Sequence, residues 1–177
     1  MNIPWQQMGG GERVLYIAAG WRRFLPAASI LIAGLAHFAP IVASLPVMPD
    51  LPLLFLLAWR AYRPELVPAW AGLPLGLAID VLSGYPVGLS GTLWPLMLMA
   101  HDVIDRRLVM RDARSDGLIA ALGILAVHLG QMGVLEWISD GTAFSHASSL
   151  VLIGLTILLF PLVARISARI ERQWLIA

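Results

Sequence analysis

The third apolar stretch of this chain contains a stripe of two glycines and a carboxylate. Gly72, Gly76 and Asp80 are spaced by four, so on a helix they share one face. The two glycines make a small-residue surface that lets another helix approach closely. A carboxylate inside a membrane span costs about 3 kcal/mol unless it is paired, neutralised or hydrated, so Asp80 is a candidate functional group. The alternative role is structural, with Asp80 bracing the turn from Ser83 to Gly88.

The histidines are the next candidates for proton chemistry or metal ligation. His37 and His128 fall inside apolar stretches, where either could hydrogen-bond Asp80 and lower the cost of burying both. His101 lies near the end of the fourth stretch and His146 at the start of the sixth. The spacings H-x-x-x-H and H-E-x-x-H are absent and the chain has no cysteine, so a metal would need ligands from three helices. We therefore expect no metal site and no cofactor.

Ser90 and His146 raise a nucleophilic alternative. The run Gly88-Leu89-Ser90-Gly91 matches the G-x-S-G of rhomboid intramembrane proteases, whose six-helix core has a serine on the fourth helix and a histidine on the sixth. The second apolar stretch offers no His or Asn to stabilise an oxyanion, and the only asparagine of the chain is Asn2. We therefore expect a protein that is not an enzyme, with a rhomboid-like serine protease as the remote alternative.

Six apolar stretches must position these residues. All 12 positive charges are arginines, and they lie before the first stretch, at the end of the second or between it and the third, between the fourth and fifth, or after the sixth. The alternate gaps, 46–50, 83–88 and 139–146, contain none. Because short loops rich in arginine stay cytoplasmic, both termini are predicted to be cytoplasmic. The stretches are Phe24 to Leu45, Leu51 to Ala61, Leu66 to Leu82, Leu89 to Ile104, Leu118 to Ile138 and Ala147 to Val163.

The composition leaves little besides a membrane domain. Hydrophobic residues make up 59% of the chain and charged residues 13%, against roughly 25% charged in soluble proteins. Spans of about 20 residues use most of the 177 residues, so no separate soluble domain fits. We predict an all-α integral protein of the bacterial inner membrane, with a six-helix transmembrane bundle at 24–164 and cytoplasmic tails at 1–23 and 165–177. Membrane lipids are expected contacts of the arginines, and nucleic acid is not.

The second stretch is short for a membrane span. It offers only about nine to eleven apolar residues, against about 20 needed. Either Arg60 and Arg63 extend it by reaching to the interface, or the segment is re-entrant or buried among the other helices. Prolines at 74, 95 and 161 are expected to bend their helices. Tryptophans near the stretch ends, such as Trp59 and Trp94, are expected to lie at the membrane interfaces.

Several motifs together resemble a known family. They are Pro49-Asp50-Leu51, the run from Trp59 to Pro64 that ends in Arg-Pro, and Gly76-Leu77-Ala78-Ile79-Asp80-Val81-Leu82-Ser83-Gly84-Tyr85-Pro86-Val87-Gly88. The last is similar to a G-L-x-x-D-x-x-[SG]-G-x-P-h-G pattern of the rod shape-determining protein MreD family. The resemblance covers about 49–107 by motif and the whole chain by length and number of spans.

The resemblance implies a non-enzymatic inner-membrane component of the cell-elongation machinery that helps to organise peptidoglycan synthesis. The partner it implies is the bitopic protein MreC and, through MreC, the actin-like MreB, the SEDS polymerase RodA and the elongation-specific penicillin-binding transpeptidase. The expected helix-packing or partner-binding residues are Gly72, Gly76, Asp80, Gly84, Pro86 and Gly88.

The same family is similar in architecture to the S components of energy-coupling-factor transporters. This similarity makes a substrate-binding membrane subunit of a vitamin-type transporter the alternative function. Such a subunit needs a pocket near the outer face, lined by aromatic and polar side chains. The outer loops offer Tyr85, Asp140 and His146 for its rim.

Overall fold

Every regular element in the described part of the chain is a helix. The computed structural model describes residues 24–35, 48–107, 113–139 and 146–174. This confirms an all-α protein for these residues, and each α-helix coincides with one predicted apolar stretch. The elements are α2 (Leu25–Leu35), α3 (Leu51–Tyr62), the 3-10 turns η3 (Pro64–Leu66) and η4 (Ala69–Ala71), α4 (Gly72–Ser83), α5 (Leu89–Arg107), α6 (Ala113–Ile138) and α7 (His146–Trp174).

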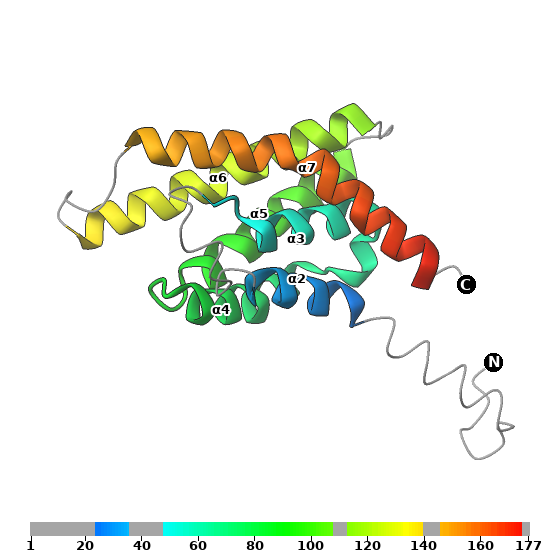
Figure 1. Ribbon diagram of the computed structural model, residues 1–177, viewed down its shortest axis with the longest axis horizontal. Helices are drawn as coiled ribbons and strands as arrows, with labels where there is room; N and C mark the ends of the chain where they lie inside the picture. The colour runs from blue at the N-terminus through cyan, green and yellow to red at the C-terminus, as the bar shows by residue number, and fades with distance from the viewer. Residues whose placement is uncertain (1–23, 36–47, 108–112, 140–145, 175–177) are drawn as a thin grey trace, which may run out of the picture.

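The helices are arranged in layers (Figure 1). The long helices α6 and α7 run along one side, α2 and α4 lie along the opposite side, and α3 and α5 lie between them. Within this stack, α4 makes its most extensive contact with α5, and α3 packs against both α2 and α7. Helix α3 is therefore enclosed between α2 and α7, whereas α5 keeps an exposed face that carries Leu96, Met99 and Val103.

Helix α3 is the buried centre of the bundle. Asp50 caps its N-terminus by accepting a hydrogen bond from the Leu53 N–H (3.1 Å), and Pro52 occupies the first turn, where its missing N–H costs nothing. Its 12 residues extend about 18 Å, well short of a bilayer core of about 30 Å. The residues from Leu53 to Arg60 are buried except for Phe55. Of the explanations for the short second stretch, burial among the other helices is the one that the structure supports.

Arg60 does not extend α3 toward the membrane surface, contrary to one sequence-based expectation. Its guanidinium is buried and forms ion pairs with Asp102 and with Asp105 (3.0 Å) on α5. It also donates to the carbonyls of Pro64 (3.3 Å) and Val67 (3.4 Å). A buried arginine needs such partners because an uncompensated charge away from water is costly. Arg60 therefore ties α3 to α5 and to the turns that follow α3.

Two helices are long and apolar enough to cross a bilayer by length and composition. They are the segments Ser115–Ile138 in α6 and Ser148–Gln173 in α7. Helix α7 continues as far as Trp174, so most of the segment expected to be a C-terminal tail is helical. Pro161 lies inside α7, which changes direction along its length in Figure 1. Pro95 lies inside α5, whereas Pro74 falls in the first turn of α4, where no helical hydrogen bond is lost.

Two tryptophans expected at the membrane interfaces belong to the core instead. Trp59 and Trp94 are both 0% exposed. The Trp59 indole N–H donates to the Ser29 hydroxyl (2.8 Å), which joins α3 to α2 and satisfies the polar end of the ring. Trp70 and Trp137 are 73% and 83% exposed, as an interfacial ring would be.

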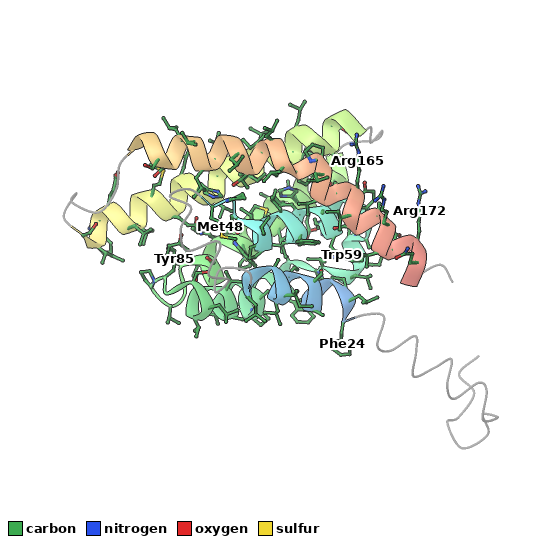
Figure 2. The ribbon with its side chains drawn as sticks, viewed as in Figure 1. Phe24, Met48, Trp59, Tyr85, Arg165 and Arg172 are labelled. Atoms are coloured by element: carbon green, nitrogen blue, oxygen red, sulfur yellow. The ribbon has the colours of Figure 1, made fainter. Side chains whose placement is uncertain are left out.

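The two ends of the bundle differ in charge. Figure 2 places Tyr85 and Met48 toward one end, and Arg165 and Arg172 toward the other. Tyr85 belongs to the turn between α4 and α5, one of the gaps without arginine. We call these the Tyr85 end and the arginine end. The candidate site lies at the Tyr85 end.

Candidate functional site

Asp80 is a fully buried carboxylate near the C-terminal end of α4. Its Oδ2 accepts hydrogen bonds from the N–H groups of Gly88 (2.9 Å) and Gly91 (3.2 Å), and its Oδ1 accepts one from the N–H of Ser90 (2.9 Å). These donors begin α5, where the first N–H groups of a helix have no internal partner and the helix dipole favours an anion. Asp80 therefore caps α5 from the neighbouring helix.

The sequence left open a hydrogen bond from His37 or His128 to Asp80, and the structure directs His128 elsewhere. The His128 Nδ1 lies 2.9 Å from the carbonyl oxygen of Ile124, one turn earlier in the same helix. His101 bonds in the same way to the carbonyl of Met97 (2.8 Å) near the arginine end. His37 lies outside the described residues. In this structure the charge of Asp80 is balanced by backbone dipoles.

The stripe of Gly72 and Gly76 brings α4 close enough for this capping. A Cβ atom placed on Gly72 would lie 2.8 Å from the backbone nitrogen of Pro95. A Cβ atom on Gly76 would lie 2.5 Å from the carbonyl oxygen of Ser90 and 2.7 Å from the nitrogen of Gly91. The contact is between two backbones of the same chain. Only glycine permits it at these positions.

The turn between α4 and α5 needs its two glycines for a different reason. Gly84 has φ = 71° and Gly88 has φ = 99°, a backbone conformation that other residues adopt only with strain. The N–H groups of Gly84 and Tyr85 donate to the carbonyl of Asp80, which ends α4. The carbonyl of Pro86 accepts from the Leu89 N–H (3.1 Å). The predicted residues of this region thus lie together at one helix junction.

A polar cavity of about 90 Å³ opens beside this junction. It lies among the first residues of α3, the turn after α4, the start of α5 and the facing sides of α6 and α7. A cavity of this size has room for ordered water. The lining residues are Met48, Asp50, Ile79, Ser83, Tyr85, Ser90, His128, Gln131, Met132, Leu135, Ser149, Leu152 and Ile153.

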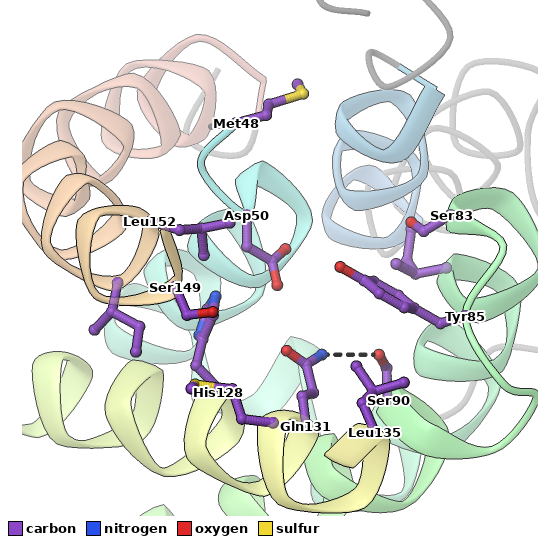
Figure 3. A pocket seen from close by; sticks show the side chains of 13 residues that line it. Met48, Asp50, Ser83, Tyr85, Ser90, His128, Gln131, Leu135, Ser149 and Leu152 are labelled. Atoms are coloured by element: carbon purple, nitrogen blue, oxygen red, sulfur yellow. Dashed lines mark hydrogen bonds between the residues drawn. The ribbon is translucent and has the colours of Figure 1, made fainter. Parts of the chain in front are cut away.

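The floor of the cavity is a buried polar pair from two helices. The Gln131 amide nitrogen donates to the Ser90 hydroxyl (3.3 Å), as Figure 3 shows. Ser90 is 1% exposed and Gln131 is 8% exposed. Buried polar groups in a membrane bundle are costly, so this pair is a candidate functional site.

Asp50 and Tyr85 face each other across the cavity. Figure 3 shows the Asp50 carboxylate and the Tyr85 hydroxyl pointing toward the same space, with Ser149 and His128 on the α6–α7 side. Partial burial, followed by the charges of Asp50 and Asp80, raises the pKa of the Tyr85 hydroxyl. Tyr85 is therefore protonated at neutral pH and offers a donor to whatever enters the cavity.

The sequence anticipated only part of this lining. Tyr85 was expected on the rim, and Ser90 and His128 were singled out for other roles. Asp140 and the side chain of His146 lie outside the described residues. Asp50, Gln131 and Ser149 were missed, although Gln131 gives a local signal: it is an amide in an apolar stretch, three residues after His128 and therefore on the same helix face.

The described geometry gives Ser90 no base. Its hydroxyl accepts from Gln131, and its N–H is committed to Asp80. A general base must lie within hydrogen-bond reach of the proton that it removes. In the part of the chain that the structure describes, no group of three or more His, Cys, Asp or Glu residues could hold a metal ion.

The described residues form an all-helical bundle with exposed apolar helix faces, buried polar groups and helices long enough to span a bilayer. These features are typical of helical membrane proteins. The family described as rod shape-determining protein MreD matches residues 22–170. The chain belongs to this family, so it is a rod shape-determining membrane protein; the family is one of structural proteins and is not a known enzyme family. No curated protein and no solved structure matches the chain.

Proposed function

We propose that this protein is a non-catalytic inner-membrane scaffold that binds MreC and thereby helps to organise peptidoglycan synthesis during elongation. The observation that carries the proposal is the family match across 22–170, which includes every helix except the last few residues of α7. MreB, RodA and the penicillin-binding transpeptidase would join through MreC. The internal bracing of α4 on α5 supports this role, because it gives the Tyr85 end a defined shape.

The orientation that we propose puts both termini in the cytoplasm and makes six crossings. The separation of Tyr85 from Arg165 and Arg172 along the bundle supports it, since arginines favour the cytoplasmic side. The chain has no cysteine, so single cysteines can be placed without background. Val87→Cys in the exposed turn should react with an impermeant maleimide in spheroplasts, and Gln173→Cys should not. Reaction at position 173 alone would reverse the orientation.

The residues proposed to meet MreC are those of the exposed turn, Gly84, Pro86 and Gly88, with Val87 at its tip. Val87 is 74% exposed, whereas Gly72, Gly76 and Asp80 are buried against α5. We propose that the stripe acts within the chain and that the turn acts between chains. Backbone conformation at the two positive-φ glycines would fix the shape that a partner meets.

Co-purification of the tagged protein from detergent-solubilised membranes tests this division. Val87→Asn should reduce recovery of MreC while the protein itself accumulates normally. Val151→Asn is the matched control, because Val151 is 58% exposed but belongs to α7 and not to the turn. Equal recovery of MreC with both variants would show that the turn is not the contact, and absence of MreC with the unchanged protein would refute the scaffold proposal.

A vitamin-type transporter subunit, similar in architecture to the S components, is the second candidate. The polar cavity at the Tyr85 end favours it, since such a pocket was expected there. The volume of about 90 Å³ opposes it, because small-molecule sites occupy roughly 300–1,000 Å³. Recovery of an ATPase pair with a coupling subunit, in place of elongation proteins, would support the transporter. For the remote protease alternative, Ser90→Ala and His146→Ala should each preserve rod shape in cells depleted of the native protein.

A further inference from the structure

The Tyr85 end carries negative charge without a formal positive charge among its described residues. Asp50 and Asp80 lie there, and Glu136 lies near the corresponding end of α6. The gaps at 46–50, 83–88 and 139–146 contain no arginine, and the chain has no lysine. Asp80 is compensated by the N-terminus of α5, and Asp50 in part by the N-terminus of α3. Asp50 is the carboxylate that lines the cavity.

The other polar groups of the cavity add hydrogen-bond acceptors. The Ile124 carbonyl can only accept, so the His128 Nδ1 carries the proton of this bond. With no second proton on the ring, Nε2 is an acceptor. The Gln131 nitrogen is used toward Ser90, which leaves its carbonyl oxygen as an acceptor. The hydroxyl of Tyr85 can donate or accept as a ligand requires.

We propose that this cavity binds a monocationic nitrogen group, an ammonium or a guanidinium, carried at the end of a flexible arm. The carboxylate of Asp50 pairs with the charge, and the acceptors of His128 and Gln131 receive its remaining N–H groups. The apolar lining, Leu135, Leu152 and Ile153 among it, contacts the methylenes of the arm. The volume of about 90 Å³ suits a head group of this size.

Two sources share this chemistry: the lysine or arginine side chain of a partner's segment and a free small amine. A bare metal ion fits less well, since the described lining provides one carboxylate and one imidazole. The inference does not depend on MreC being the partner.

The test uses the purified full chain in nanodiscs of a zwitterionic lipid, with n-butylammonium as the probe and 1-butanol as its neutral isostere. Saturation-transfer NMR and titration calorimetry should show butylammonium binding and no comparable binding of butanol. Asp50→Asn keeps a good helix cap but removes the charge, and it should weaken binding by about tenfold or more. Glu136→Gln removes the same charge outside the cavity lining and should bind as the unchanged protein does.

Tyr85→Phe provides a second variant that loses only a hydroxyl, and it should weaken binding several-fold even if Asp50→Asn accumulates poorly. Equal binding of butanol and butylammonium, or unchanged affinity in both cavity variants, would overturn the proposal. Co-purification then separates the two sources. If a partner's side chain is the occupant, butylammonium and Asp50→Asn both reduce recovery of that partner; if a free amine is the occupant, partner recovery is unchanged while the amine still binds.

Discussion

The replacement of Gly76 by alanine tests the close contact of α4 with α5. A Cβ atom there would lie 2.5 Å from the Ser90 carbonyl oxygen, whereas ordinary contact begins at 3.4 Å. The obstacle is backbone, so no side-chain rotation can relieve it. The two helices must separate by about 0.9 Å, which stretches the Asp80 bonds to Ser90 and Gly91 from 2.9 and 3.2 Å beyond hydrogen-bonding distance.

The expected loss of stability combines two effects. Overpacking of a close contact costs about 1–3 kcal/mol. A weakened hydrogen bond to a buried carboxylate costs up to about 1.5–3 kcal/mol. Separating the helices relieves the overpacking but weakens the hydrogen bonds to Asp80, so the two costs do not add in full. We expect Gly76→Ala to lower the free energy of unfolding by about 2–4 kcal/mol.

Reversible unfolding in mixed micelles, followed by tryptophan fluorescence, measures this difference. Gly133→Ala is the matched control, since Gly133 lies on α6 with no neighbouring atom within 4 Å of the added Cβ. Alanine at a helical glycine with open space should raise stability by about 0.5–1 kcal/mol. If Gly76→Ala proves as stable as Gly133→Ala, then α4 and α5 do not approach each other as described, and the argument for the glycine stripe fails.

Three further predictions concern the charged and polar groups. Asp80→Asn should lower the unfolding free energy by about 1–3 kcal/mol in the same assay, because an amide cannot accept from all three N–H groups and sets a donor against a donor; stability equal to the unchanged protein would contradict the capping role. Arg60→Met should lower the unfolding free energy by up to about 3–5 kcal/mol, because it leaves partly buried carboxylates without their cation. The loss should be below this upper value because water reaches Asp102, which is 34% exposed. Asp102→Asn combined with Asp105→Asn should restore part of the loss. Because the pKa of Tyr85 is raised, the folded state keeps the phenol proton at pH values just above about 10, at which the unfolded chain has lost it. Stability should therefore fall as the pH rises above about 10. Tyr85→Phe should flatten this decline in alkaline thermal melts.

The sequence alone determined the order and approximate bounds of the helices, because hydropathy and turn residues are local properties. Each predicted stretch contains a described helix, and the glycines at 84 and 88 stand at the two positive-φ positions. The family could also be recognised from the sequence, because its most specific motif is a continuous run across α4 and the turn that follows it. The importance of Asp80 followed from its charge alone.

Tertiary structure decided what these residues touch. Spacing by four shows that Gly72, Gly76 and Asp80 share a face, but it cannot show that the face meets the backbone of α5. The donors to Asp80 are N–H groups, which every residue except proline carries, so they leave no trace in the sequence.

The cavity and the burial of α3 have the same cause. Asp50 caps α3, Gln131 lies on α6 and Ser149 lies on α7, so Asp50 and Ser149 are nearly 100 residues apart in the sequence. Only the packing of these helices brings the three residues to one space. Trp59 and Arg60 looked like interfacial residues because they end a short stretch, yet the flanking helices surround them and supply Ser29 and the α5 carboxylates as partners. An apolar segment can face either lipid or other helices, because both surroundings are apolar. Hydropathy therefore cannot distinguish a core helix from a membrane-facing helix, and only the packing arrangement does.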